Sequence, residues 1–262
     1  MRLPRSFARE KYFVQSVGEL QALFQKIESW CIDDLVRVLE QSSPHRGLVI
    51  SYAHCETMYL LAYRLKSRSV FQQTDHIYID GVGAQIAMCM LDGRWRSRMT
   101  AEDYLEPVCK RLHDLNRRIA FIGSQQGMTE VAANSLSRTG TVENVLCLDG
   151  FGDVSDLTKL CETLRQGDVD VVFLGLGQPL QESLAHEISV RCPRTTIVCV
   201  GALFEQLQQN PPIARALRPL GLEWMVRLCR EPRRLASRYL LHPWITASWI
   251  VKYQLRMLSG RA

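Results

Sequence analysis

Residues 169–177, VDVVFLGLG, form an apolar run that ends in two glycines and leads directly into Gln178 and Pro179. Successive positions are apolar instead of alternating, which is typical of a strand covered by helices on both faces. Five further runs of this kind occur at residues 47–53, 76–80, 118–124, 142–149 and 195–201. We therefore expect each run to form a strand of one buried sheet.

Segments with helical periodicity fill the gaps between these strands, for example residues 56–66, 101–115 and 129–137. This alternation predicts an α/β fold with a Rossmann-like, doubly wound and mainly parallel sheet. Ligands of such folds bind where the carboxyl ends of the strands meet. The chemistry is therefore expected in the residues that directly follow the strands.

The charge distribution divides the chain near residue 210. Residues 215–262 carry ten Lys or Arg and two acidic residues, whereas the first 214 residues carry 22 basic and 25 acidic ones. Pro211 and Pro212 interrupt the chain just before, and the remainder is helical in pattern. We expect a Rossmann-like domain at 1–210 and a helical, basic appendage at 211–262. The excess of positive charge indicates a polyanionic partner: anionic lipid, phosphate or nucleic acid.

Composition is that of a globular protein from a reducing compartment. The 262 residues are 47% hydrophobic, enough for a sizeable core. The nine cysteines include no C-x-x-C pair, so neither a zinc knuckle nor a thioredoxin-type site is indicated, and no metal site is expected. No window offers about 20 uninterrupted apolar residues, and the N-terminus lacks the apolar stretch of a signal peptide. We therefore expect a cytoplasmic protein without a membrane-spanning helix.

Asp80 ends one of the predicted strands and is followed by Gly81 and Gly83. Glycines at such a place let a ligand approach the backbone, and the amides that open the next helix favour phosphate. Asp80 is either a fixed catalytic carboxylate or the cap of that helix. A dinucleotide site is disfavoured because Ile86 replaces the third glycine of G-x-G-x-x-G.

Gly175 and Gly177 end the strand quoted first, and Gln181 and Glu182 open the following helix. The glycines leave room for a ligand, and the two polar side chains offer hydrogen bonds to a sugar or a ribose. An ordinary strand–turn–helix junction has the same pattern. The segment is therefore a candidate binding site and not a proven one.

Arginines 227, 230, 234 and 238 are spaced three, four and four residues apart, as on one helix face. Pro232 favours the start of a new helix, which would break this stripe. A bound anion and a solvated basic face both explain such a cluster, and the scarcity of acidic residues around it favours the anion.

Residues 244–258 are apolar around most of a helix, with a narrow polar strip that includes Ser248, Lys252 and Arg256. Basic residues beside tryptophans are typical of a helix that lies on a bilayer surface, although a helix packed on its own domain has the same pattern. The residues expected to contact the membrane are Arg230, Arg238, Trp244, Trp249, Lys252 and Arg256.

In these segments the chain resembles the WecG/TagA/CpsF glycosyltransferases, bacterial enzymes of teichoic acid, common antigen and exopolysaccharide assembly. The matching segments lie between about residue 47 and residue 240, in family order. The block GLEW at 221–224 followed by EPRRL at 231–235 is the most specific. The others are DGVG at 80–83, FIGS at 121–124, GLGQPLQE at 175–182 and VGALF at 200–204.

The resemblance implies a metal-independent, inverting transfer of a hexose from a UDP-sugar to an undecaprenyl-diphosphate-linked saccharide, without a cofactor. It implies that Asp80 is the general base, that Gln181 lies in the active site, and that Arg227 stabilises the leaving diphosphate. It implies a peripheral position on the cytoplasmic face of the inner membrane. Ser51 matches a threonine of the family outside these segments and is expected to bind substrate. Within the matching segments, the expected substrate-binding residues are Gly81, Gly83, Gly123, Gly175, Gly177, Glu182, Gly201, Phe204 and Arg234.

The sequence departs from the family pattern at Leu180, where lysine is usual, and at Ala202 and Glu205, which replace a common glycine and aspartate. These changes leave the hexose open between N-acetylmannosamine and another sugar such as glucose. The oligomeric state is also left open, a homo-oligomer included.

Three other classes of function remain to be weighed. A nucleotide-dependent oxidoreductase is disfavoured by the missing third glycine. A non-catalytic module that docks on the membrane is disfavoured by the joint presence of Asp80, Gln181 and Arg227. Nucleic-acid binding by the basic tail is disfavoured because no recognised motif accompanies the charge, and the tryptophans suit lipid better.

Overall fold

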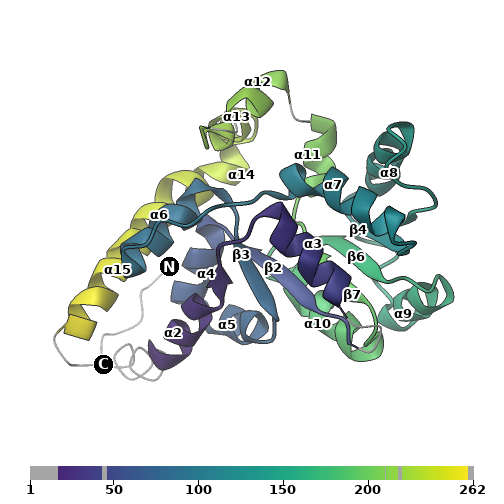
Figure 1. Ribbon diagram of the computed structural model, residues 1–262. Helices are drawn as coiled ribbons and strands as arrows, with labels where there is room; N and C mark the ends of the chain where they lie inside the picture. The colour runs from purple at the N-terminus through teal and green to yellow at the C-terminus, as the bar shows by residue number, and fades with distance from the viewer. Residues whose placement is uncertain (1–16, 43–45, 210, 218–219, 259–262) are drawn as a thin grey trace.

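The computed structural model describes residues 17–42, 46–209, 211–217 and 220–258. In this part of the chain, seven parallel strands form one sheet in the order β1-β3-β2-β7-β6-β4-β5 (Figure 1). The strands are β1 (Ile27–Glu28), β2 (Val49–Ala53), β3 (His76–Ile79), β4 (Ile119–Gly123), β5 (Leu146–Leu148), β6 (Val171–Gly175) and β7 (Thr196–Cys199). The predicted fold class is confirmed.

Helices cover both faces of this sheet (Figure 1). One face carries α3 (Ile32–Gln41), α7 (Ala101–Asp114), α8 (Met128–Arg138) and α11 (Leu203–Gln209). The other carries α4 (Cys55–Tyr63), α5 (Leu65–Gln72), α6 (Gly81–Asp92), α9 (Leu157–Gln166) and α10 (Leu180–Arg191), with α2 (Val17–Gln25) outside them. The last part of the chain forms α12 (Pro212–Leu217), α13 (Glu223–Arg230), α14 (Pro232–Ala236), the π-helical turn η1 (Ser237–Leu241) and α15 (His242–Leu258).

All six predicted strands are present, and β1 is the strand that the sequence did not reveal. It contains two residues and pairs with β3 at the edge of the sheet, with Ile27 opposite Ile77 and Glu28 opposite Tyr78. A two-residue strand has too few positions for an apolar run to stand out from its surroundings. The helix boundary at Pro232 is as expected, because α13 ends at Arg230 and α14 begins at Pro232.

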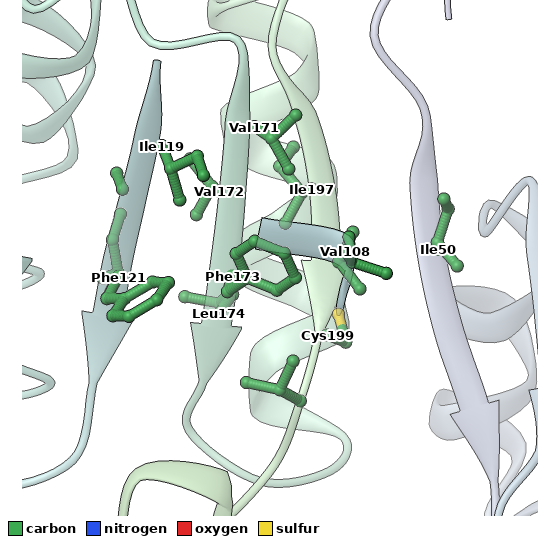
Figure 2. Close-up of a cluster of buried hydrophobic side chains, with 14 of the residues drawn as sticks. Ile50, Val108, Ile119, Phe121, Val171, Val172, Phe173, Leu174, Ile197 and Cys199 are labelled. Atoms are coloured by element: carbon green, nitrogen blue, oxygen red, sulfur yellow. The ribbon is translucent and has the colours of Figure 1, made fainter. Parts of the chain in front are cut away.

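The main core lies between the central strands and the helices on either side. Figure 2 shows its centre, where Phe121 of β4 and Phe173 of β6 meet edge to face at 5.7 Å between ring centroids. Five successive residues are buried in each of β2, β4 and β6, as expected for strands covered on both faces. This rigid centre fixes the positions at which the strands end.

A second core cluster lies beside it and includes the C-terminal helix. Trp249, Ile250 and Tyr253 of α15 are buried against α2, α4 and α6, and the Phe24 ring lies 5.9 Å from that of Trp249. The expectation that Trp249 contacts the membrane is therefore wrong: its side chain is 4% exposed and belongs to the core. The alternative of a helix packed on its own domain holds for this face of α15.

The connections between strands place a topological switch point at the carboxyl edge. From β4 the chain moves outward to β5, whereas from the adjacent β6 it moves inward to β7. Ligand-binding crevices form where the connections that leave two neighbouring strands run in opposite directions along the sheet. Asp80 on β3 lies three strands from β6 and four from β4, or about 14–19 Å at the usual strand spacing. A ligand that uses both places must be extended.

Substitutions of the two tryptophans of α15 are expected to differ in their effect on stability. Trp249→Ala is expected to lower the free energy of unfolding by about 3–5 kcal/mol, because it leaves a cavity in the second core. Trp244→Ala, at a side chain 76% exposed, is expected to change it by less than about 0.5 kcal/mol. Urea unfolding followed by circular dichroism measures both. Equal effects of the two substitutions would contradict the assignment of Trp249 to the core.

Candidate active site

Asp80 lies at the carboxyl end of β3, beside the end of β2. Ala53 of β2 is the register partner of Ile79, and the Asp80 amide donates a hydrogen bond to the Ala53 carbonyl at 2.8 Å. The residues that follow this pair, His54 and Asp80, are therefore neighbours at the carboxyl edge. Gly81 next turns the chain with a φ of +79°, which a side chain would strain.

The Asp80 carboxyl does not cap the following helix. It occupies the N-cap position of α6, but no hydrogen bond joins its side chain to the first turn of that helix. The capping interpretation is therefore wrong, and the half-buried carboxyl is available for other partners. Burial raises the pKa of Asp80 to about 6, against the lowering effect of Arg227, Arg238 and Arg98. A carboxyl of this kind is ionised at neutral pH and still basic enough to accept a proton.

Arg227 reaches the site from α13. Its Nη2 atom lies 3.4 Å from the Glu102 carboxylate and 3.4 Å from that of Glu223, so two acidic side chains hold the guanidinium. Its Nε atom is buried and has no hydrogen-bond partner among the described residues. The preceding turn packs closely on α6, because a Cβ at Gly221 would lie 2.1 Å from Val82. Arg227 therefore keeps donor capacity for an anion.

Arg238 is a second arginine whose charge acts on Asp80, and its predicted contact with the membrane stays a prediction. It lies in η1, is half-buried, and its charge acts on Asp80, Tyr52 and His54. The stripe of arginines is broken at Pro232, as expected from the sequence, and Arg238 lies in the π-helical turn that follows α14. A π-helical turn changes which side chains share a face, and spacing alone does not reveal it.

A pair of contacts attaches this part of the appendage to α4. His242 Nδ1 lies 2.8 Å from the Glu56 carboxylate, and the His242 ring stacks on Tyr59 at 3.9 Å between centroids. Both partners on α4 come shortly after the end of β2. The contacts fix the start of α15 and therefore the position of Arg238 four residues earlier.

Gln181 is fully buried and holds the loops of the carboxyl edge together. Its Oε1 atom accepts hydrogen bonds from the amides of Gly177, at 3.2 Å, and Gly201, at 3.0 Å. Its Nε2 atom donates to Glu182 at 2.8 Å. The side chain is 0% exposed, so Gln181 positions the loops after β6 and β7 and does not itself face a ligand.

Three residues expected to bind substrate lie inside the protein instead. Ser51 is 0% exposed and donates to Glu182 Oε1 at 2.7 Å, and Glu182 is itself 1% exposed. Phe204 is 0% exposed and packs on Phe121, with 5.2 Å between the ring centroids. The expectation of direct substrate contact is wrong for all three, because a sequence pattern does not give the direction of a side chain at a strand end.

The predicted glycines serve close packing in some cases and access in others. A Cβ at Gly123 would lie 2.1 Å from the Gly175 carbonyl, and one at Gly201 would lie 2.2 Å from the Tyr52 hydroxyl. Gly123, Gly175 and Gly201 are buried, whereas Gly81, Gly83 and Gly177 remain at least partly exposed. The latter three are the glycines that leave room for a ligand.

The remaining predicted residues lie on the outside of the appendage. Arg234 forms a two-point ion pair with Glu231 on the surface, at 2.5 and 2.9 Å, and does not reach the site. Arg230, Lys252 and Trp244 are exposed, and Arg256 is half-buried. Apart from Trp244, the sequence did not single out the exposed apolar residues of this region. Together these form an exposed stripe along η1 and α15 that consists of Leu240, Leu241, Trp244, Val251 and Leu255.

Two further findings bear on where ligands bind. An open depression of about 510 Å³ lies at the amino ends of β4 and β6 and is lined by Glu40, Arg111, Leu115, Asn116, Arg117 and Asp170. Its arginines are paired with Glu40 and Asp170, and it is at the opposite edge from Asp80. Among the described helices, none is both long enough and apolar enough to span a bilayer.

A parallel α/β sheet with a carboxylate at one strand end, on which arginines of a C-terminal appendage act, agrees with the class of glycosyltransferase that the sequence resembles. The sequence profile of the Glycosyl transferase WecG/TagA/CpsF family matches residues 22–260. The chain belongs to this family.

Two curated relatives carry the name N-acetylglucosaminyldiphosphoundecaprenol N-acetyl-beta-D-mannosaminyltransferase. The one from Bacillus spizizenii is 23% identical over 206 residues, which cover 78% of this chain and 79% of the relative. The one from Bacillus subtilis is 24% identical over 216 residues, or 81% of this chain and 80% of the relative. The similarity extends over most of both chains.

The raised pKa of Asp80 predicts that the wild-type residue destabilises the fold. The native carboxyl keeps its proton to a pKa of about 6, above the unfolded value of about 3.9, so stability falls as pH rises between these values and is constant above them. At pH 7, Asp80→Asn is expected to raise the free energy of unfolding by about 2–3 kcal/mol, at about 1.4 kcal/mol for each pKa unit. Denaturant unfolding at several pH values measures this, and an Asn variant less stable than wild type at pH 7 contradicts it.

Proposed function

We propose that this chain transfers a hexose from a UDP-sugar to a saccharide linked to polyprenyl diphosphate, with inversion and without a metal ion, in the assembly of a bacterial cell-surface polysaccharide. The observation that carries this proposal is the half-buried Asp80 carboxyl, with a pKa near 6, under the charges of Arg227 and Arg238. A base beside cations is the arrangement that a displacement with an anionic leaving group requires.

In the proposed reaction, a hydroxyl oxygen of the acceptor sugar attacks the anomeric carbon of the donor, and Asp80 takes the hydroxyl proton. The bond from that carbon to the diphosphate breaks on the opposite face, which inverts the configuration. The leaving UDP carries away the electron pair, and the guanidinium groups of Arg227 and Arg238 stabilise the negative charge. Two arginines take the place that a divalent cation has in other transferases.

The extended form of a sugar nucleotide fits the layout of the carboxyl edge. The switch point between β4 and β6 is a suitable place for the nucleoside, with Ser124 at its edge, whose hydroxyl is buried without a partner among the described residues. The diphosphate then points along the sheet toward Arg238 and the sugar toward Asp80. The names of the two relatives support N-acetylmannosamine as the donor hexose and a diphosphoundecaprenol-linked N-acetylglucosamine as the acceptor.

A donor screen tests this function directly. The purified full chain is incubated with UDP-N-acetylmannosamine, UDP-N-acetylglucosamine or UDP-glucose, and with N-acetylglucosamine linked to farnesyl diphosphate, and products are identified by mass spectrometry. We expect transfer from one donor, unchanged in EDTA, and a loss of about 10²–10⁴-fold in kcat for Asp80→Asn. Nuclear magnetic resonance of the product reports its anomeric configuration. Absence of transfer from every donor, or full activity of Asp80→Asn, would refute the proposal.

Arg238→Ala is expected to weaken the binding of UDP about tenfold or more, because a charge-assisted contact to the diphosphate is lost. Arg233→Ala is the matched control, since Arg233 is exposed on the neighbouring helix α14. Isothermal titration calorimetry with UDP measures both affinities. If the two variants bind UDP equally well, Arg238 does not contact the diphosphate.

We further propose that the exposed stripe and the basic residues beside it attach the protein to the cytoplasmic face of the inner membrane. Leu240, Leu241 and Trp244 are 54%, 54% and 76% exposed. Insertion of such side chains into a bilayer contributes about 1.5–3 kcal/mol each when they become fully buried. Lys252 adds attraction to anionic lipid.

Replacing Leu240, Leu241 and Trp244 together by serine is expected to lower the affinity for vesicles of anionic lipid by at least about 100-fold. Sedimentation with the vesicles measures this affinity. Val190→Ser is the control, at a side chain 66% exposed on α10. Point substitutions are needed because deleting the appendage would also remove the core residues of α15. Unchanged sedimentation of the triple variant would contradict the proposed membrane surface.

A further inference from the structure

Two half-buried aromatic residues lie beside the arginines of the appendage, and the proposed reaction gives them no task. Trp224 is on α13, three residues before Arg227, and Tyr239 directly follows Arg238 in η1. The two rings lie 5.7 Å apart between centroids, with an angle of 48° between their planes. This contact therefore joins the two elements that carry the arginines.

The guanidinium of Arg238 lies over the ring of Tyr239. Its Cζ atom is 5.7 Å from the ring centroid, a distance at which a cation is attracted to the face of an aromatic ring. A carboxylate in this place would neutralise the charge of the arginine, whereas a ring restrains the guanidinium and leaves its charge in place. Tyr239 therefore orients Arg238 without removing its attraction for an anion.

Trp224 extends this restraint to the other arginine. Residues three positions apart on a helix are neighbours on its surface, so Trp224 and Arg227 share a face of α13. The charges of Arg227 and Arg238 both act on Asp80, which places the two guanidinium groups around one site. The contact between Trp224 and Tyr239 therefore limits how far these two groups move apart.

Arg227 is held in place and still has capacity for a stronger contact. Its Nη2 atom lies 3.4 Å from the Glu102 carboxylate and 3.4 Å from that of Glu223. Both distances are long for a charge-assisted hydrogen bond, which is usually about 2.7–2.9 Å. A phosphate oxygen at the usual distance would therefore interact with this guanidinium more strongly than either carboxylate does.

We propose that Trp224 and Tyr239 are positioning residues, which hold Arg227 and Arg238 at a spacing that lets each guanidinium contact one of two linked phosphates. The site then prefers a nucleoside diphosphate to a nucleoside monophosphate. Neither ring touches the nucleotide in this arrangement, and each acts through an arginine. The inference rests on the proposed transferase function for the identity of the nucleotide, whereas the preference for two phosphates is measured by binding alone and needs no turnover.

The affinities for UDP and for UMP distinguish a positioning role from a role in folding. Isothermal titration calorimetry on the full chain measures both. Trp224→Ala is expected to weaken UDP binding about three- to tenfold, as for the loss of one aromatic pair, and to weaken UMP binding less than about twofold. Equal losses for the two nucleotides would mean that Trp224 only supports the fold, and would overturn the proposal. A wild-type protein that binds UMP as tightly as UDP would also overturn it.

Matched variants show whether the ring itself is required. Trp224→Phe retains a ring and is expected to bind UDP within about twofold of wild type. Trp95→Ala, at a side chain 65% exposed outside the appendage, should bind both nucleotides as wild type does. Circular dichroism reports whether each variant is folded, and Trp224→Leu, which keeps apolar volume without a ring, replaces Trp224→Ala if that variant does not fold. Equally weak UDP binding by Trp224→Phe and Trp224→Ala would contradict a role for the ring.

A double-mutant cycle tests whether Tyr239 acts through Arg238. Tyr239→Leu is expected to weaken UDP binding about three- to tenfold in the otherwise wild-type protein, and less than about twofold in the Arg238→Ala background. Tyr239→Phe keeps the ring face and should behave as wild type. Equal losses in both backgrounds would overturn the role of Tyr239. If the expected affinities are found but no donor supports transfer, that result counts against the proposed transferase function alone.

Discussion

The carboxyl edge of the sheet depends on the buried side chain of Gln181. Its oxygen accepts from the amides of Gly177 and Gly201, and its nitrogen donates to Glu182, which in turn accepts from Ser51. One amide thus joins the ends of β2, β6 and β7. Buried backbone amides need acceptors, and glutamine alone offers both an acceptor and a donor at this length. A glutamate or a leucine would leave part of this network unsatisfied, and the loops that surround the site would separate.

The appendage supplies the cationic half of the site and is also part of the core. Arg227 and Arg238 come from α13 and η1, while Trp249 and its neighbours on α15 fill the second core cluster. The stacking of His242 on Tyr59 and its contact with Glu56 lie between these two parts. One continuous helical region therefore carries the arginines, the core contacts and the exposed apolar stripe. Under the proposed membrane attachment, the segment that contacts the bilayer is therefore continuous with the one that carries the arginines.

How much the sequence could predict depends on whether a property belongs to the backbone or to the side chain. Strand positions follow from apolar runs, so Asp80 and the glycines were found at strand ends where the structure has them. The direction of a side chain at a strand end does not follow from such runs, so the buried Ser51 and Phe204 were taken for ligand contacts. The nearness of His54 to Asp80 was not foreseen because no motif marks it: it arises from the register between β2 and β3. The π-helical turn that contains Arg238 was not foreseen, because residue spacing alone does not reveal such a turn.

The basicity of Asp80 has its origin in the burial of its carboxyl. Burial is the largest influence on the pKa of Asp80 and raises it. Three arginines lower this pKa: Arg227 and Arg238 belong to the appendage, and Arg98 does not. A carboxylate exposed to water would have a pKa near 4 and would accept a proton poorly at neutral pH. A buried carboxylate without cations would stay protonated and could not act as a base. Burial and the two arginines of the appendage together give Asp80 a pKa at which it is ionised at neutral pH and still basic.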